Sequence, residues 1–261
     1  MKKAIADLYL ENISNTEFIR EPEVMEYMEK VNIFLREYFP LYNPREWRYI
    51  EEYDEDGLLV VWQEYIVKTV YEVYNSFLYG NFMCAISMTR TLIESYVYYS
   101  ILKKEQNPNL ILEWFFSNHL NSVRYMNGKF KHKMKAIHEM FCDLKGIDSE
   151  ETWQRYIKAD DHENEWLKTL KMKKTTFSVC CEYIEEKQIY KDYREAGNFV
   201  HAQSIVTKLE PFTFYETIFS KMTLMMIYIF KALRLFNQSE ETELAIQELE
   251  MELFKLNNVF L

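Results

Sequence analysis

Arg194 and His201 are the two side chains whose types and spacing could carry out chemistry together. Six residues separate them, and Asn198 lies four residues after Arg194. Two helical turns span about seven residues, so all three side chains can project from one helix face. Arginine binds a phosphate through a planar fork of donors, and histidine gives or takes a proton near neutral pH. The pair suits metal-free RNA cleavage, in which a base activates the 2′-hydroxyl; the alternative is that His201 only caps its helix.

Arg90 and Glu94 form a second charged pair, four residues apart on one face of an otherwise apolar predicted helix. A charged pair that points towards a core needs polar partners, because unpaired buried charge is costly. The alternative is an ordinary exposed ion pair, which adds little stability.

Two lysine-rich segments are the places where an RNA backbone could bind to an otherwise acidic chain. The alternative for each is a solvated surface that balances nearby acids. The first segment also holds His132 and Lys135, and the second also holds Lys168. The candidate RNA-binding lysines are Lys129, Lys131, Lys133, Lys171, Lys173 and Lys174.

With its Arg194–His201 spacing, the chain resembles the HEPN superfamily, whose helical domains carry an R-x(4–6)-H motif. The helix with Arg90 and Glu94 is similar to the R-x-x-x-E helix of some bacterial proteins of that kind. The resemblance covers roughly residues 58–104 and 176–236. It implies a core of four to five helices and a homodimer in which two such motifs face each other.

The same resemblance implies a metal-independent endoribonuclease of a toxin or anti-phage defence system. Arg194 would bind the scissile phosphate and His201 would act as acid and base, supported by Asn198, Glu94, Arg90 and Tyr193. RNA would be the substrate, no cofactor would be needed, and an antitoxin or other defence-system protein would be a partner. The alternative is a non-catalytic interaction or sensor module of such a system, in which a buried acid such as Glu94 pairs with Arg194.

No residue pattern indicates a metal site. The polar run 160–165 could offer oxygen and imidazole ligands, but it lacks the turn glycine of a calcium loop, so a solvated helix start is favoured. The four cysteines lack the histidine spacing of zinc sites and indicate reduced core thiols. We expect the chain to reside in the cytoplasm.

Composition narrows the class of protein. Only five glycines and five prolines occur among 261 residues, too few for a glycine-rich nucleotide-binding fold or a β-sandwich. The net charge of −10 argues against sequence-blind nucleic-acid binding, although a small cationic site remains compatible with it. An early acid argues against a signal peptide, and no apolar stretch is long enough to span a membrane.

Apolar periodicity predicts an all-α helical bundle. The resemblance implies that this bundle contains a HEPN-like core. The expected helices cover about 22–39, 58–79, 81–104, 163–173, 176–187, 188–200 and 212–236, with Ser239 capping an amphipathic last helix. One or two more are expected within 110–142. We predict an N-terminal helical arm at 1–57, a HEPN-like domain at 58–237 with an insertion at 105–175, and a C-terminal helix at 238–261.

Overall fold

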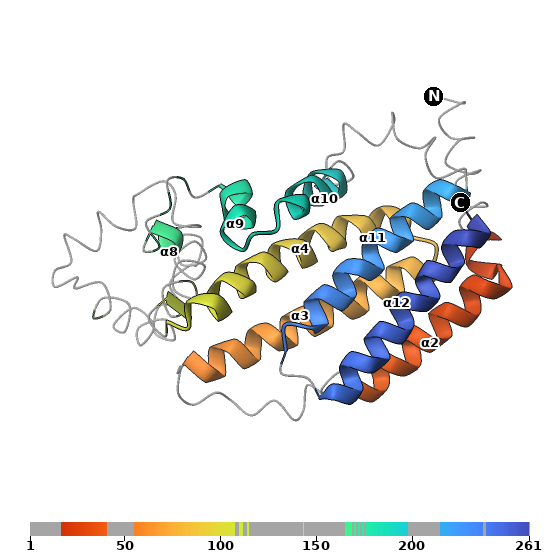
Figure 1. Cartoon of the computed structure of the whole chain (residues 1–261), viewed down its shortest axis with the longest axis horizontal. Coiled ribbons are helices and arrows are strands. Elements are labelled where there is room, and N and C mark those ends of the chain that lie inside the picture. The colour runs from red at the N-terminus through yellow and green to blue at the C-terminus, as the bar shows by residue number, and fades with distance from the viewer. Residues whose placement is uncertain are drawn as a thin grey trace, which may run out of the picture. The chain divides into compact units, whose positions relative to one another are not determined.

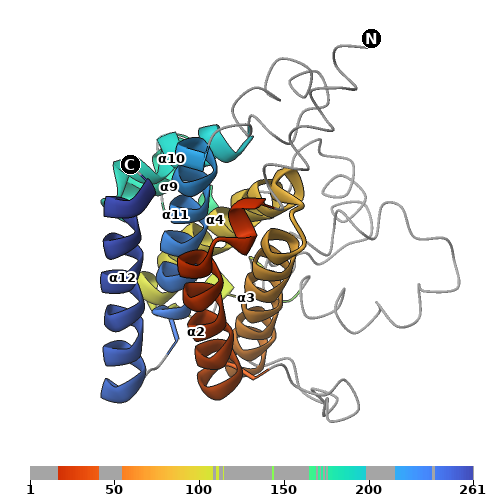
Figure 2. The same ribbon diagram turned by 90° about the vertical axis from the view of Figure 1, so that its right-hand side faces the viewer.

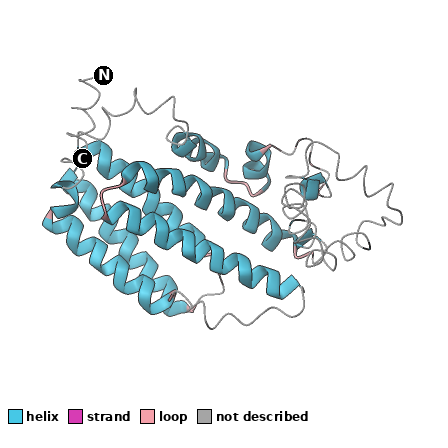
Figure 3. Ribbon diagram, turned by 180° about the vertical axis from the view of Figure 1, so that it is seen from behind, coloured by secondary structure: helices cyan, strands magenta, loops and turns pink. Residues whose placement is uncertain are grey.

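All regular secondary structure in the part of the chain that the computed structural model describes is helical: it contains eight bounded helices and no strand (Figure 3). The all-α prediction is therefore confirmed for these residues. The described residues are 17–40, 55–107, 110–111, 114, 143, 165–168, 170, 172, 174, 176–197, 215–236 and 239–260.

The chain divides into two compact units. Unit 1 comprises Met1–Arg48, Gln63–Ser100 and Glu186–Leu261, and unit 2 comprises Tyr49–Trp62 and Ile101–Glu185. Helices α3 (Glu55–Leu78) and α4 (Phe82–Glu105) supply residues to both units, and every candidate site residue discussed below with a described side chain, apart from Lys174, belongs to unit 1.

Helices α2 (Pro22–Tyr38) and α12 (Glu240–Phe260) pack side by side (Figures 1 and 2). They run antiparallel, because Phe18 lies against Phe260 near one end and Tyr38 donates to Glu241 near the other. Pro22 occupies the start of α2, where its missing N–H costs nothing. Each helix buries apolar residues at three- and four-residue intervals, as the sequence pattern predicts.

The turn between α3 and α4 depends on a glycine. Gly80 has φ 73°, a left-handed conformation that costs a glycine little. The Asn81 N–H donates to the Ser76 carbonyl and the Gly80 N–H to the Phe77 carbonyl, the paired bonds of a Schellman helix end. The Asn81 side chain then accepts the Cys84 N–H at 3.3 Å and begins α4. The predicted break at Gly80 is confirmed.

Helix α11 (Tyr215–Leu233) is buried on most sides, as its strongly apolar sequence predicts. Phe230 packs edge-on against Phe34 of α2, and Phe219 stacks on Phe260 of α12. The predicted cap at Ser239 is confirmed, because its hydroxyl accepts the Thr242 N–H at 3.2 Å.

Three shorter helices are α8 (Glu165–Lys168), α9 (Phe177–Tyr183) and α10 (Lys187–Gly197). The prediction of one helix over 163–173 is wrong, because the chain turns at Leu170 and is not helical at Met172. Helix α9 also ends four residues earlier than predicted, because Glu185 adopts the left-handed φ of 66°.

Candidate functional site

Arg194 lies exposed near the end of α10. Within the described part of the chain, no residue forms a hydrogen bond or ion pair with its guanidinium. An arginine side chain stays charged at all physiological pH values. Arg194 is therefore a cation that the described surroundings leave available to an anionic ligand.

Tyr193, the preceding residue, connects α10 to α4 by hydrogen bonds. Its hydroxyl donates to a Glu94 carboxylate oxygen at 2.7 Å and accepts a bond from an Arg90 Nη atom. Arg90 Nε also lies 3.6 Å from the same Glu94 oxygen. The three side chains form a closed triangle, which we call the Tyr193 cluster.

Partial burial and ring contact strengthen the Tyr193 cluster. The Arg90 and Glu94 side chains keep only 26% and 35% of their exposure. The Arg90 guanidinium carbon lies 4.5 Å from the centre of the Tyr193 ring, within cation–π range. Burial, and then the bond to Glu94, raise the pKa of Tyr193, so its hydroxyl stays protonated and can donate.

Glu94 is therefore engaged by Arg90 and Tyr193. The Arg90 and Glu94 side chains are partly buried and have Tyr193 as a polar partner, which a charged pair near a core needs and an ordinary exposed ion pair does not. The pairing of Glu94 with Arg194, expected if the chain is only an interaction module, is absent between these described residues.

Gly197 lies against the guanidinium of Arg90. A Cβ atom added to this glycine would stand 3.4 Å from an Arg90 Nη atom and 3.7 Å from its Cδ atom. An added methyl group would therefore meet Arg90 in ordinary contact, while a larger side chain would displace it. Gly197 thus marks a close approach of α10 to α4, at a position where an alanine would also fit.

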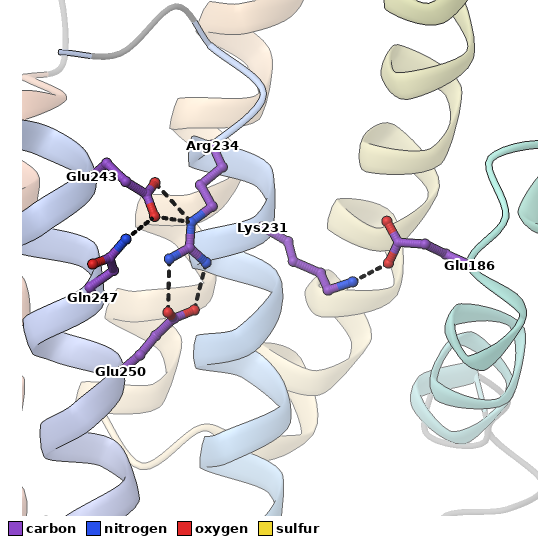
Figure 4. Close-up of polar contacts among 6 residues, drawn as sticks. All are labelled: Glu186, Lys231, Arg234, Glu243, Gln247 and Glu250. Atoms are coloured by element: carbon purple, nitrogen blue, oxygen red, sulfur yellow. Dashed lines mark hydrogen bonds and ion pairs between the residues drawn. The ribbon is translucent and has the colours of Figure 1, made fainter. Parts of the chain in front are cut away.

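Further polar contacts hold α10 and its preceding turn in place. The buried Tyr228 of α11 donates to Asp192 at 2.7 Å, and Lys221 pairs with Glu195. Glu186 accepts a bond from Lys231 (Figure 4). It also accepts a bond from the hydroxyl of Tyr96. The apolar residues Ile189 and Ala196 of α10 are buried.

Asp192 was not singled out from the sequence. The usable signal is Tyr228, because a tyrosine within a strongly apolar helix needs a partner for its hydroxyl. Sequence alone does not say which acid supplies it.

Comparisons of the chain with protein families, curated proteins and solved structures find no match. The arrangement of its own residues is therefore the basis for any functional proposal.

Several predicted site residues lie outside the described part of the chain. Among these are His201 and Asn198, which follow the described end of α10. Lys174 is exposed. The other five candidate RNA-binding lysines also lie outside the described residues: Lys129, Lys131, Lys133, Lys171 and Lys173.

No group of three potential metal ligands comes together among the residues with described positions. Most of the polar run at 160–165 lies outside the described residues. Burial raises the pKa of the Cys180 thiol to about 11, which keeps it protonated and unreactive at neutral pH. Over these same residues, no helix has the length and apolar character that crossing a bilayer requires.

Proposed function

We propose that the protein is a metal-independent endoribonuclease in which Arg194 binds the scissile phosphate and His201 transfers protons. The single observation that carries this proposal is the exposed Arg194 guanidinium, to which no described residue bonds. A buried arginine tied to Glu94 would have opposed it.

The chemistry needs two groups and no metal. His201 takes the proton of the RNA 2′-hydroxyl, and the 2′-oxygen attacks the adjacent phosphorus. The bond between phosphorus and the 5′-oxygen breaks, and that oxygen takes the proton from the protonated His201, which restores the neutral base. Arg194 stabilises the negative charge on the phosphate oxygens as the transition state forms. The products are a 2′,3′-cyclic phosphate and a 5′-hydroxyl.

The Tyr193 cluster is assigned a positioning role. It fixes the backbone one residue before Arg194 through three contacts with α4. Asp192 and Glu195, on either side, are held by Tyr228 and Lys221 of α11. Three residues of α10 next to Arg194, namely Asp192, Tyr193 and Glu195, are thus held by neighbouring helices and support the exposed arginine, as a preorganised phosphate site requires.

The competing function is a non-catalytic interaction module of a defence system. The net charge of −10 and the exposed apolar side chains of α12 favour it. Incubation of the purified protein with RNA separates the two functions, because a non-catalytic interaction module would not cleave RNA.

The test incubates the purified full chain with total cellular RNA in EDTA, alongside His201→Ala and Arg194→Lys variants. Arg36→Lys, the same change at an exposed arginine of α2, is the matched control. We expect 2′,3′-cyclic phosphate ends from the wild type and the control, and strongly reduced yields from the two site variants. Absence of wild-type cleavage, or undiminished cleavage by His201→Ala, overturns the proposal.

A further inference from the structure

Helix α12 carries a second apolar row in addition to its buried one. Ile246, Leu249 and Leu253 face the core and are nearly inaccessible. Leu244, Met251, Phe254 and Val259 are 54%, 58%, 70% and 56% exposed. Large apolar side chains gathered on one exposed helix are typical of a binding surface.

Two charged residues interrupt this exposed row. Glu248 and Lys255 are both exposed and lie seven residues apart, with Met251 between them. Leu244, Glu248, Met251, Lys255 and Val259 follow one another at intervals of three and four residues, so they share a helix face. We call these five residues the outer face of α12.

The remaining acids of α12 that point towards neighbouring helices are bonded. Glu243 and Glu250 accept bonds from Arg234 of the α11 end, at 3.0 Å and 2.6 Å for their closest contacts (Figure 4). Glu252 pairs with Lys30 of α2 at 2.9 Å. By contrast, Glu248 and Lys255 have no ion pair or hydrogen bond with any described residue.

We propose that the outer face of α12 binds the same face of a second copy of this chain, with the two helices antiparallel about a two-fold axis beside Met251. In a two-fold interface, a contact from residue i to residue j is repeated from j to i. An axis between residues 251 and 252 therefore places Glu248 opposite Lys255 of the second copy, and Lys255 opposite its Glu248. The two Met251 side chains meet at the centre, and Leu244 faces Val259.

Charge complementarity selects this arrangement. A parallel pairing of the same face would place Glu248 against Glu248 and Lys255 against Lys255, and like charges repel. The antiparallel pairing replaces both repulsions with attractions and buries the central methionines. The outer face is thus complementary to itself in one orientation.

This surface is separate from the proposed ribonuclease site. Helix α12 packs on α2 and α11, whereas α10 bonds to α4 and α11. Dimerisation through the outer face of α12 does not depend on RNA cleavage. It also uses a different surface from the dimer that the HEPN resemblance implies, in which two R-x(6)-H motifs face each other.

Charge reversal tests the proposal. Sedimentation equilibrium of the full chain should show a reversible dimer, and Glu248→Lys or Lys255→Glu should each raise its dissociation constant about tenfold or more. An equimolar mixture of the two variants should regain association, because each then offers the charges that the other lacks. Glu72→Lys, at an exposed glutamate of α3, is the matched control and should leave the dimer unchanged.

A cross-link supplies a second measurement. Met251→Cys should form a disulfide-linked dimer under mild oxidation, because the two-fold axis brings both copies of this position together. Met25→Cys, at a similarly exposed methionine of α2, should not. A wild type that stays monomeric at about 0.1 mM overturns the proposal. So does a dimer that neither charge reversal weakens, since it must then use another surface.

Discussion

The hydroxyl of Tyr193 donates to Glu94 at 2.7 Å across the interface between α10 and α4. The two residues are 99 positions apart in the chain. Through this bond Glu94, which pairs with Arg90 within α4, also gains a partner from α10. Glu94 is thus engaged by Tyr193 and Arg90, while the neighbouring Arg194 is exposed.

Removing this hydroxyl should weaken the attachment of α10. Tyr193→Phe keeps the ring over Arg90 but deletes both hydrogen bonds, so we expect a loss of about 1 kcal/mol in unfolding free energy. In a protein of this size that lowers the melting temperature by about 2–4 °C. Tyr190→Phe is the matched control, because no described residue bonds to its hydroxyl. Equal melting temperatures for the two variants would show that the Tyr193 hydroxyl contributes nothing to stability.

The periodic parts of the fold are predictable from sequence. The spacing of Ile246, Leu249, Leu253 and Leu256 is enough to predict α12 and its buried face, and Gly80 is enough to predict the break between α3 and α4. These features depend on local chemistry. The prediction for 163–173 fails because the apolar spacing of Trp166, Leu167 and Leu170 indicates one continuous helix, whereas the chain turns at Leu170.

The candidate site is predictable only in part. The pairing of Arg90 with Glu94 follows from their spacing within one helix. The bonds of Tyr193 to this pair cannot be predicted from spacing, because they depend on which residue of α10 packs against α4. The same holds for Asp192, whose bond to Tyr228 crosses from α10 to α11.

Gly197 should respond to substitution according to side-chain size. Gly197→Ala places a methyl group in ordinary contact with Arg90 and favours the helix by up to about 1 kcal/mol. Gly197→Leu must push the Arg90 side chain away from Tyr193 and should destabilise the fold. Chemical denaturation of both variants measures the difference. If Gly197→Leu proves as stable as Gly197→Ala, the close approach of α10 to Arg90 is wrong.

Glu243 should make the stability of the protein depend on acid pH. The hydrogen bond from Arg234 lowers the pKa of this carboxyl below its ordinary value of 4.5. The folded state therefore stabilises the ionised form of this carboxyl, relative to the protonated form, more than the unfolded chain does. This stabilisation is complete above the ordinary pKa and is lost as pH falls through the lower folded pKa.

Glu243→Gln should accordingly lose stability at neutral pH and show a shallower fall in stability below pH 4.5 than the wild type. Denaturant unfolding across that pH range measures both effects. Glu240→Gln is the control, because this exposed acid of the same helix bonds to no described residue. Parallel stability curves for Glu243→Gln and wild type would contradict the role of the Arg234 bond.

Arg194→Lys should separate the phosphate-binding role of this residue from its charge. Lysine keeps the positive charge but loses the planar fork that grips two phosphate oxygens at once, so we expect cleavage to fall about tenfold to a hundredfold. Because Arg194 is exposed and bonds to no described residue, the melting temperature should stay unchanged. The cleavage rate on a short labelled RNA, measured with melting temperature on the same preparation, tests both expectations. Full activity in Arg194→Lys would mean that any cation suffices there, and the assignment of Arg194 as a two-point phosphate ligand would fail.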